Sequence, residues 1–257
     1  MAGQQDLESR NFPSWSESSL GQSLIAMERT ALQACLPSLK GSTALQVGSN
    51  AGTPLLESCN FPHRFILVDH AGKVRPAEDD GFQYLESMHG NLPLASESVD
   101  LCLLPHVLEF SRTPHDLLRE VERVLVSRGH AVILGFNPYS VWGIRSLFTK
   151  DSGPAPWNGH YLSLMRLRDW LRLLGFDIKA GMMLYYRPPS RSIMMRNRLA
   201  FLEKAGNRWW PMLSAVYMLT AQKNVAGMTI IEVKQRFRKV PYLGAVEPVA
   251  RTRSHCG

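Results

Sequence analysis

The fold class is decided by one stretch of the sequence, Val99-Asp100-Leu101-Cys102-Leu103-Leu104-Pro105-His106-Val107-Leu108-Glu109. Its first six residues form an apolar run that only Asp100 interrupts, and the run ends at Pro105 and His106. Short runs of continuous rather than alternating hydrophobicity are typical of strands that are buried on both faces of a parallel sheet. We therefore predict a central parallel strand with polar side chains beyond its carboxyl end.

Similar apolar runs lie on both sides of this stretch, over residues 44–47, 65–68 and 131–134. We predict buried strands at all three positions for the same reason. Between the strand that starts at Val99 and the strand over 131–134, the sequence predicts a helix. Thr113 is its expected N-cap, Pro114 its first residue, and Gly129 is expected to close it. The alternation of strands and helices favours right-handed crossovers, and thus an α/β fold with a doubly wound, mostly parallel sheet.

Further elements are expected around this core. We predict an amphipathic helix over residues 17–36, a second helix over 163–174, an extended segment over 176–186, a helical insertion over about 190–208 and a final antiparallel strand over 215–221. The first of these helices either closes over a ligand or simply covers a face of the sheet. We divide the chain into an N-terminal helical cap (1–40), an α/β domain (41–223) and a basic C-terminal tail that is partly unpacked (224–257).

The composition excludes several classes of protein. The chain has 257 residues, of which 45% are hydrophobic and 20% charged, and this balance is unlike that of disordered, collagen-like or coiled-coil chains. Its longest uncharged windows are too short for a transmembrane helix, and its first residues lack the basic and apolar regions of a signal peptide. The four cysteines show no CxxC spacing, so we expect reduced thiols, no metal site and a cytoplasmic location.

Positive charge is concentrated at the C-terminal end. From Arg187 onward the chain has 13 of its 29 Lys and Arg residues but 3 of its 22 Asp and Glu residues. Such a segment can bind RNA phosphates or an anionic membrane surface, with Trp209 and Trp210 as stacking or interfacial side chains. A solvated tail is the alternative that we favour, so nucleic acid is not the preferred partner. The sequence leaves the oligomeric state open.

Two sequence features predict a nucleoside ligand. The first strand runs directly into the glycine-containing turn of residues 48–53, where backbone N–H groups can approach a carboxylate or phosphate. The second strand ends at Asp69, 21 residues after Gly48, where a carboxylate can accept hydrogen bonds from ribose hydroxyls. Together these features indicate an adenosine-type ligand, whereas separately they also fit a tight connecting turn and a helix cap.

Longer motifs extend this pattern over roughly residues 43–137. They comprise Gly48-x-Asn50-x-Gly52, Asp69, Asn91-Leu92-Pro93-Leu94, the stretch 99–109, Leu118-Arg119-Glu120-Val121-Glu122-Arg123-Val124-Leu125 and Gly129-His130-Ala131-Val132-Ile133. In this combination the chain resembles class I S-adenosylmethionine-dependent methyltransferases, and most of all the subgroup that contains the quinone-biosynthesis methyltransferases. The resemblance implies a seven-stranded sheet of the Rossmann-like type, with the cofactor across the carboxyl ends of the first strands.

The resemblance also implies which residues bind S-adenosylmethionine and its product S-adenosylhomocysteine. The glycine turn would contact the methionine and ribose parts, Asp69 the ribose, residues 89–92 the adenine, and Pro105 with His106 would face the methyl group. The complete set of implied cofactor contacts is Gln46, Gly48, Ser49, Asn50, Gly52, Asp69, His70, His89, Gly90, Asn91, Leu92 and Pro105.

The chain departs from the family pattern at four positions. Gln46 replaces an acidic residue before the glycine turn, Asn50 replaces the middle glycine, Met88 or His89 replaces an aspartate that usually contacts adenine, and Phe110 replaces a histidine. The change at Asn50 is mild, because asparagine tolerates the left-handed conformation. Loss of the negative charge at Gln46 keeps open the alternative of a catalytically silent domain that binds a cofactor or a partner.

The predicted reaction is methyl transfer to a small acceptor that is hydrophobic or aromatic. His106 is the candidate general base, because it is titratable and lies at a strand's carboxyl end. Its alternative is a structural hydrogen-bonding role. Candidate acceptor contacts are Glu109, Asn137, Tyr139 and Trp142. Glu109 alternatively caps the next segment, and Tyr139 and Trp142 alternatively belong to a surface loop packed by its aromatics. RNA- or protein-directed methyl transfer that uses the basic tail is the second hypothesis.

Overall fold

The computed structural model describes residues 15–48, 54–69, 81–87, 91–149, 156–189 and 201–224, together with residues 194, 198 and 199. Its strands are β1 (Thr43–Val47), β2 (His63–Asp69), β3 (Gln83–Ser87), β4 (Val99–Pro105), β5 (Leu125–Phe136), β6 (Phe176–Leu184) and β7 (Val216–Lys223). They form one seven-stranded sheet in the order β3-β2-β1-β4-β5-β7-β6. Strands β1 to β5 are parallel, whereas β7 runs antiparallel to β5 and β6. The predicted α/β fold class is confirmed.

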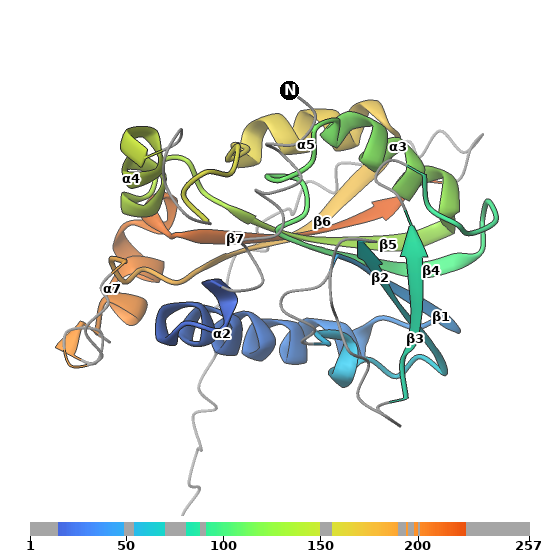
Figure 1. Ribbon diagram of the computed structural model, residues 1–257, viewed down its shortest axis with the longest axis horizontal. Helices are drawn as coiled ribbons and strands as arrows, with labels where there is room; N and C mark the ends of the chain where they lie inside the picture. Colours follow the sequence, from blue (N-terminus) through green and yellow to red (C-terminus); the bar gives the residue numbers. More distant parts are fainter. Residues whose placement is uncertain are drawn as a thin grey trace, which may run out of the picture. The chain divides into compact units, whose positions relative to one another are not determined.

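Helices lie on both faces of this sheet (Figure 1). The α-helices are α2 (Ser19–Cys35), α3 (Pro114–Val124), α4 (Val141–Thr149), α5 (Leu164–Leu173) and α7 (Phe201–Trp209), and the 3₁₀ turns are η1 (Leu36–Ser38), η2 (Leu56–Ser58) and η3 (Pro211–Leu213). Helix α2 covers one face, and α3 and α5 cover the other. None of the helices in the described part of the chain is long and apolar enough to cross a membrane.

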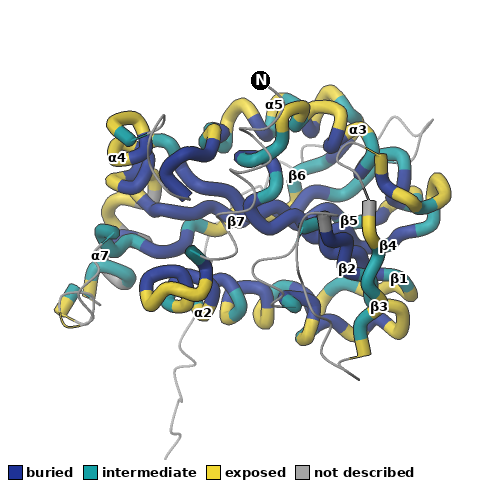
Figure 2. The backbone as a smooth tube through the Cα atoms, viewed as in Figure 1, coloured by how far each residue is buried: buried dark blue, intermediate teal, exposed yellow. Residues whose placement is uncertain are grey.

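The packing of the central strand β4 explains why its sequence is continuously apolar. Leu101 and Leu103 pack into the core beneath α2, whereas Cys102 and Leu104 pack into the core beneath α3 and α5. All four side chains are inaccessible to solvent, as Figure 2 shows for the central strands in dark blue. Because successive side chains point to opposite faces, a strand covered on both sides needs apolar residues at every position.

The sheet order reverses between β1 and β4, which are adjacent and parallel. Strand β1 leads outward to β2 on one side, and β4 leads outward to β5 on the other. In open α/β sheets this reversal opens a crevice beyond the carboxyl ends of the strands, where ligands bind. The fold therefore places the ends of β1 and β4 at the expected binding edge.

The prediction that Gly129 closes the helix after Thr113 is wrong. Helix α3 ends at Val124, and Gly129 lies inside β5. The last helical carbonyls need no glycine motif, because Glu97 donates its N–H to the carbonyl of Arg123 and Ser98 donates to that of Val124. These long-range hydrogen bonds satisfy the helix end, and the chain enters the strand directly.

Two more elements differ from the sequence-based expectation. The segment after β5, expected as a loop, forms helix α4. The sequence analysis did not predict strand β3, because this strand has no apolar run. It lies at the sheet edge, and those of its side chains whose burial is described are exposed or half-buried.

Of the helix expected over about 190–208, the structure describes α7, which begins at Phe201. Apart from Asn224, the predicted tail lies outside the described residues.

Candidate functional site

The glycine turn begins with a residue that only glycine fits well. Gly48 follows β1 with φ of +78°, a left-handed conformation that side chains rarely adopt. Its N–H donates to the carbonyl of Leu67 at the end of β2, and an added Cβ would lie 2.9 Å from Cγ2 of Val107. The rest of the turn, residues 49–53, lies outside the described part.

Gln46 connects the two ends of this turn. Its buried side chain accepts a hydrogen bond from the N–H of Leu55 (2.9 Å) and donates one to the carbonyl of Gly48 (3.3 Å). A carboxylate at this position accepts hydrogen bonds but cannot donate to the Gly48 carbonyl. Replacement of the usual acid by Gln46 thus removes a charge and adds a hydrogen bond that fixes the turn.

Beyond β4, His106 lies between two buried glutamates. Its Nε2 is 2.7 Å from Oε1 of Glu28 on α2, and its Nδ1 is 3.6 Å from Oε1 of Glu109. The same Glu109 oxygen accepts the N–H of Phe136 at 2.6 Å. All three side chains of the Glu28–His106–Glu109 cluster are almost inaccessible to solvent. The cluster joins α2 to the carboxyl ends of β4 and β5.

The cluster changes the acid–base behaviour of His106. Burial lowers the pKa of the imidazole, but attraction and hydrogen bonding to Glu28 and Glu109 outweigh this effect and raise the pKa to about 10. The ring is therefore protonated at neutral pH and cannot accept another proton. The general-base role stays a prediction, and this geometry favours its alternative, a structural hydrogen-bonding role.

Aromatic rings surround Phe136 at the same edge. The ring of His106 stacks on it at 4.2 Å between centroids. The other ring contacts of Phe136 are with Tyr161 (5.0 Å), Trp142 (6.0 Å) and Trp15 (6.3 Å). Trp15 and Tyr161 are half-buried, whereas Phe136 and Trp142 are buried. We call these four residues the ring cluster.

The predicted acceptor contacts occupy different environments around this cluster. Trp142 is 1% exposed, and its Nε1 donates to the carbonyl of Arg187. The buried Asn137 donates its amide to the carbonyls of Met212 and Ser214. Tyr139 is 61% exposed. The structure thus brings Glu109 and Trp142 to the carboxyl edge. Both Asn137 and Trp142 use their side-chain donors for hydrogen bonds within the protein.

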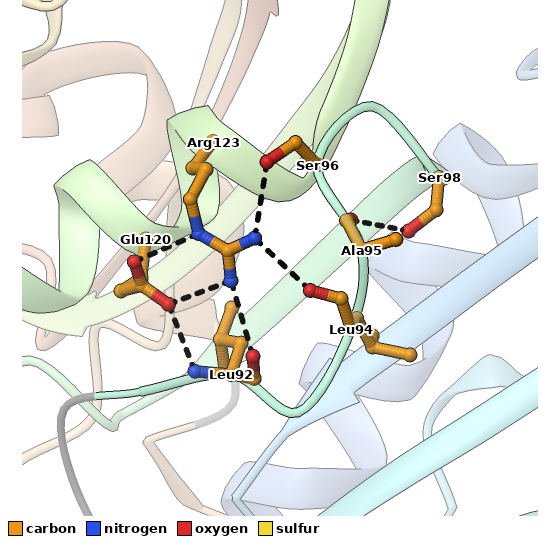
Figure 3. A network of polar contacts seen from close by, with 7 residues as sticks. All are labelled: Leu92, Leu94, Ala95, Ser96, Ser98, Glu120 and Arg123. Atoms are coloured by element: carbon orange, nitrogen blue, oxygen red, sulfur yellow. Dashed lines mark hydrogen bonds and ion pairs between the residues drawn. The ribbon is translucent and has the colours of Figure 1, made fainter.

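A polar network holds residues 92–96, which begin with the last of the residues that the resemblance assigns to adenine binding (Figure 3). Glu120 accepts the N–H of Leu92 and forms an ion pair with Arg123, both residues lying on α3. The guanidinium of Arg123 also donates to the carbonyls of Leu92 and Leu94 and to the hydroxyl of Ser96. One helical turn therefore fixes the path of residues 92–96.

A family model described as a methyltransferase domain matches residues 45–133, which run from β1 to β5. The chain is 31% identical over 214 residues to the protein YafS of Escherichia coli, covering 83% of this chain and 81% of YafS. It belongs to the same family as YafS and is a class I S-adenosylmethionine-dependent methyltransferase.

Two further similarities agree with this assignment. A methyltransferase of Mycobacteroides abscessus is 30% identical over 162 residues, covering 52% of this chain and 61% of that protein. The crystal structure of an S-adenosylmethionine-dependent methyltransferase from Thermotoga maritima matches with a TM-score of 0.60 and 18% identity, covering 80% of this chain and 92% of that chain. The latter similarity supports the fold.

The described part of the methyltransferase fits S-adenosylmethionine at the carboxyl edge. Gly48 begins the glycine turn with a left-handed conformation, Asp69 ends β2, and the buried Pro105 ends β4. Leu92 is buried and fixed by the polar network, and Asn91 beside it is exposed. The other predicted cofactor contacts lie outside the described residues, namely Ser49, Asn50, Gly52, His70, His89 and Gly90.

Sequence reasoning missed three residues of this site. Glu28 lies within the buried stripe of α2, between Leu24 and Ala31, where a carboxylate is unusual and needs a partner. That position was the available signal. Glu120 and Arg123 were noticed only as parts of a motif, although their spacing of three residues places them on one helical face.

The network of Arg123 leads to a first prediction. Arg123→Met should lower the free energy of unfolding by about 1.5–3 kcal/mol, because charge-assisted hydrogen bonds to residues 92–96 are lost. The matched control is Arg119→Met on the same helix, whose side chain is 71% exposed and contacts only Asp116 among the contacts described. It should change stability by less than about 0.5 kcal/mol. Chemical denaturation measures both, and equal losses would contradict the prediction.

The same network predicts a loss of stability in acid. Hydrogen bonding to Arg123 lowers the pKa of Glu120 and outweighs the effect of its burial. A lowered folded-state pKa contributes stability above the unfolded value, and this contribution disappears as the pH falls through the folded value. Unfolding measured from pH 7 to pH 3 should therefore show a smaller acid-induced loss in Glu120→Gln than in the wild type.

Proposed function

We propose that this methyltransferase acts on a small acceptor that is hydrophobic and aromatic, of the quinone or quinol type. The observation that carries the proposal is the ring cluster at the carboxyl ends of β4 and β5. Aromatic rings favour offset or edge-to-face contacts with a planar aromatic acceptor. The half-buried Trp15 and Tyr161 are the members of the cluster that can form such contacts without a rearrangement of the core.

Electrostatics support the binding of a positively charged cofactor at this edge. When bound, S-adenosylmethionine supplies a methyl group on a positively charged sulfur. The Glu28–His106–Glu109 cluster adds two acidic side chains to this edge of the sheet. We infer that these acids take the place of the one that is lost at Gln46. The protein's remaining task is to align the acceptor with the methyl group and to exclude water.

Binding of the cofactor is the first test. Isothermal titration of the purified protein with S-adenosylmethionine and S-adenosylhomocysteine should give micromolar or tighter binding, after mass spectrometry has excluded carried-over ligand. Asp69→Ala should weaken this affinity by about 1.5–3 kcal/mol, because charge-assisted hydrogen bonds to the ribose are lost. Unchanged affinity in a folded Asp69→Ala variant would remove Asp69 from the site.

Acceptor assays test the substrate class. Quinols, simple phenols, amines and RNA should be incubated with radiolabelled S-adenosylmethionine, and we expect transfer to quinols above all. Transfer to RNA that is lost on truncation after Asn224 would instead support the second hypothesis, an RNA-directed enzyme.

Gln46 favours one further candidate, a silent domain that binds a partner. In this case a folded and ligand-free sample would bind neither S-adenosylmethionine nor S-adenosylhomocysteine. Gln46→Glu is informative here, because it restores the acid but removes the hydrogen bond to the Gly48 carbonyl. If the hydrogen bonds of Gln46 stabilise the turn, the Gln46→Glu variant should bind the cofactor less tightly than the wild type does.

A further inference from the structure

Large apolar side chains are exposed on two neighbouring parts of the protein. The first part is α4 and the second comprises α7, Trp210 and η3. The exposed residues are Val141, Ile144, Leu147 and Phe148 on α4, and Phe201, Trp209, Trp210, Met212 and Leu213 on the second part. We call them the α4–α7 surface. Such concentrations of exposed apolar side chains usually mark interaction sites.

Hydrogen bonds connect the two parts of the surface. Asn137, just before α4, donates its amide to the carbonyls of Met212 and Ser214 at η3. Trp142 of α4 donates to the carbonyl of Arg187, whose side chain pairs with Glu203 of α7. Both helices lie at the same end of the sheet in Figure 1, and Figure 2 shows exposed residues on each. The two parts can therefore face one partner together.

The sequence around both parts of this surface is rich in basic residues. Residues 187–210 contain six Lys and Arg residues and one acid, Glu203, which is paired with Arg187 at 3.2 Å. Helix α4 contributes Arg145, which is exposed, and no acid. The partner should accordingly be anionic.

The side-chain types distinguish among anionic partners. Single-stranded RNA is held by stacking on rings, which gives no role to the exposed aliphatic residues Ile144, Leu147 and Leu213. A second copy of this chain would bring like charges together across a symmetric interface. An anionic lipid surface accommodates all three features: aliphatic side chains enter the acyl boundary, tryptophans lie at the headgroups and basic residues attract the lipid charge.

We propose that the α4–α7 surface docks on the surface of an anionic lipid bilayer. Helix α4 follows β5 directly, so docking brings the carboxyl edge of the sheet close to the lipid. This placement gives a lipid-dissolved acceptor a short path to the ring cluster. The docking itself does not depend on the identity of the acceptor.

Vesicle sedimentation tests the docking. The full chain should sediment with vesicles of equimolar phosphatidylcholine and phosphatidylglycerol, sediment less in 0.5 M salt, and sediment little with phosphatidylcholine alone. Trp209→Ser with Trp210→Ser, and separately Leu147→Ser with Phe148→Ser, should each lower the partition coefficient at least tenfold. Circular dichroism and thermal unfolding check that the variants remain folded.

The matched control uses exposed apolar residues elsewhere. Met165 and Leu173 on α5 are 67% and 85% exposed, and Met165→Ser with Leu173→Ser should leave vesicle binding unchanged. The proposal is overturned if the wild type fails to sediment or if the control loses binding as strongly as the surface variants. It is also overturned if light scattering shows a dimer that both surface variants dissociate, or if these variants lose RNA binding and keep vesicle binding.

Discussion

Replacing His106 with leucine should lower the free energy of unfolding by about 3–5 kcal/mol at neutral pH. The variant leaves Glu28 and Glu109 buried without the positive charge that lies between them. Breaking a buried ionic cluster by removing one member is costly, because the remaining charges cannot regain their hydration. Glu28→Gln should cost less, because the amide keeps a hydrogen bond to the ring and leaves one charge pair intact. Denaturant unfolding measures both losses.

The pH dependence gives an independent check of the same cluster. Because the pKa of His106 is raised to about 10 in the folded protein, its contribution to stability is complete below the unfolded value of about 6.5. That contribution decreases above pH 6.5 and is lost as the pH rises through about 10. The stability difference between the wild type and His106→Leu should shrink over the same range.

Nuclear magnetic resonance of the histidine rings tests the protonation directly. The ring signal of His106 should remain that of an imidazolium beyond pH 8. His130 serves as an internal control, because burial and the nearby Lys179 lower its pKa. A His106 signal that titrates at or below pH 6.5 would contradict the cluster and restore the ring as a candidate general base.

The sequence predicted those elements whose signals are local. The apolar run of β4 requires burial on both faces, and Ser163 and Gly175 delimit α5 by a side-chain cap and a left-handed turn. The end of α3 was mispredicted because its carbonyls are satisfied by Glu97 and Ser98, which approach from another part of the chain. Helix ends of this kind depend on the tertiary fold.

The site was predicted less completely than the fold, for a related reason. The position of His106 at a strand end is a local property, but its partner Glu28 precedes it by 78 residues and lies on a covering helix. A polar residue within an apolar stripe signals that a partner exists, without saying which one.

Trp142 provides the last prediction, because its predicted contact with the acceptor and its burial imply different results. It contacts Trp15, Phe136, Trp157 and Tyr185, with centroids 5.2–6.1 Å apart. Trp142→Ala should therefore lower the free energy of unfolding by about 3–5 kcal/mol. Trp142→Phe keeps a ring but loses the hydrogen bond to the Arg187 carbonyl, and should cost about 1 kcal/mol.

The control is a tryptophan on the surface. Trp209 is 69% exposed, and Trp209→Ala should change the free energy of unfolding by less than about 0.5 kcal/mol. Kinetics of Trp142→Phe then separate the two roles, because a structural tryptophan alters stability while KM for the acceptor stays unchanged. A raised KM at unchanged stability would show that the ring contacts the acceptor, which requires α4 to move from the position described, since Trp142 is only 1% exposed there.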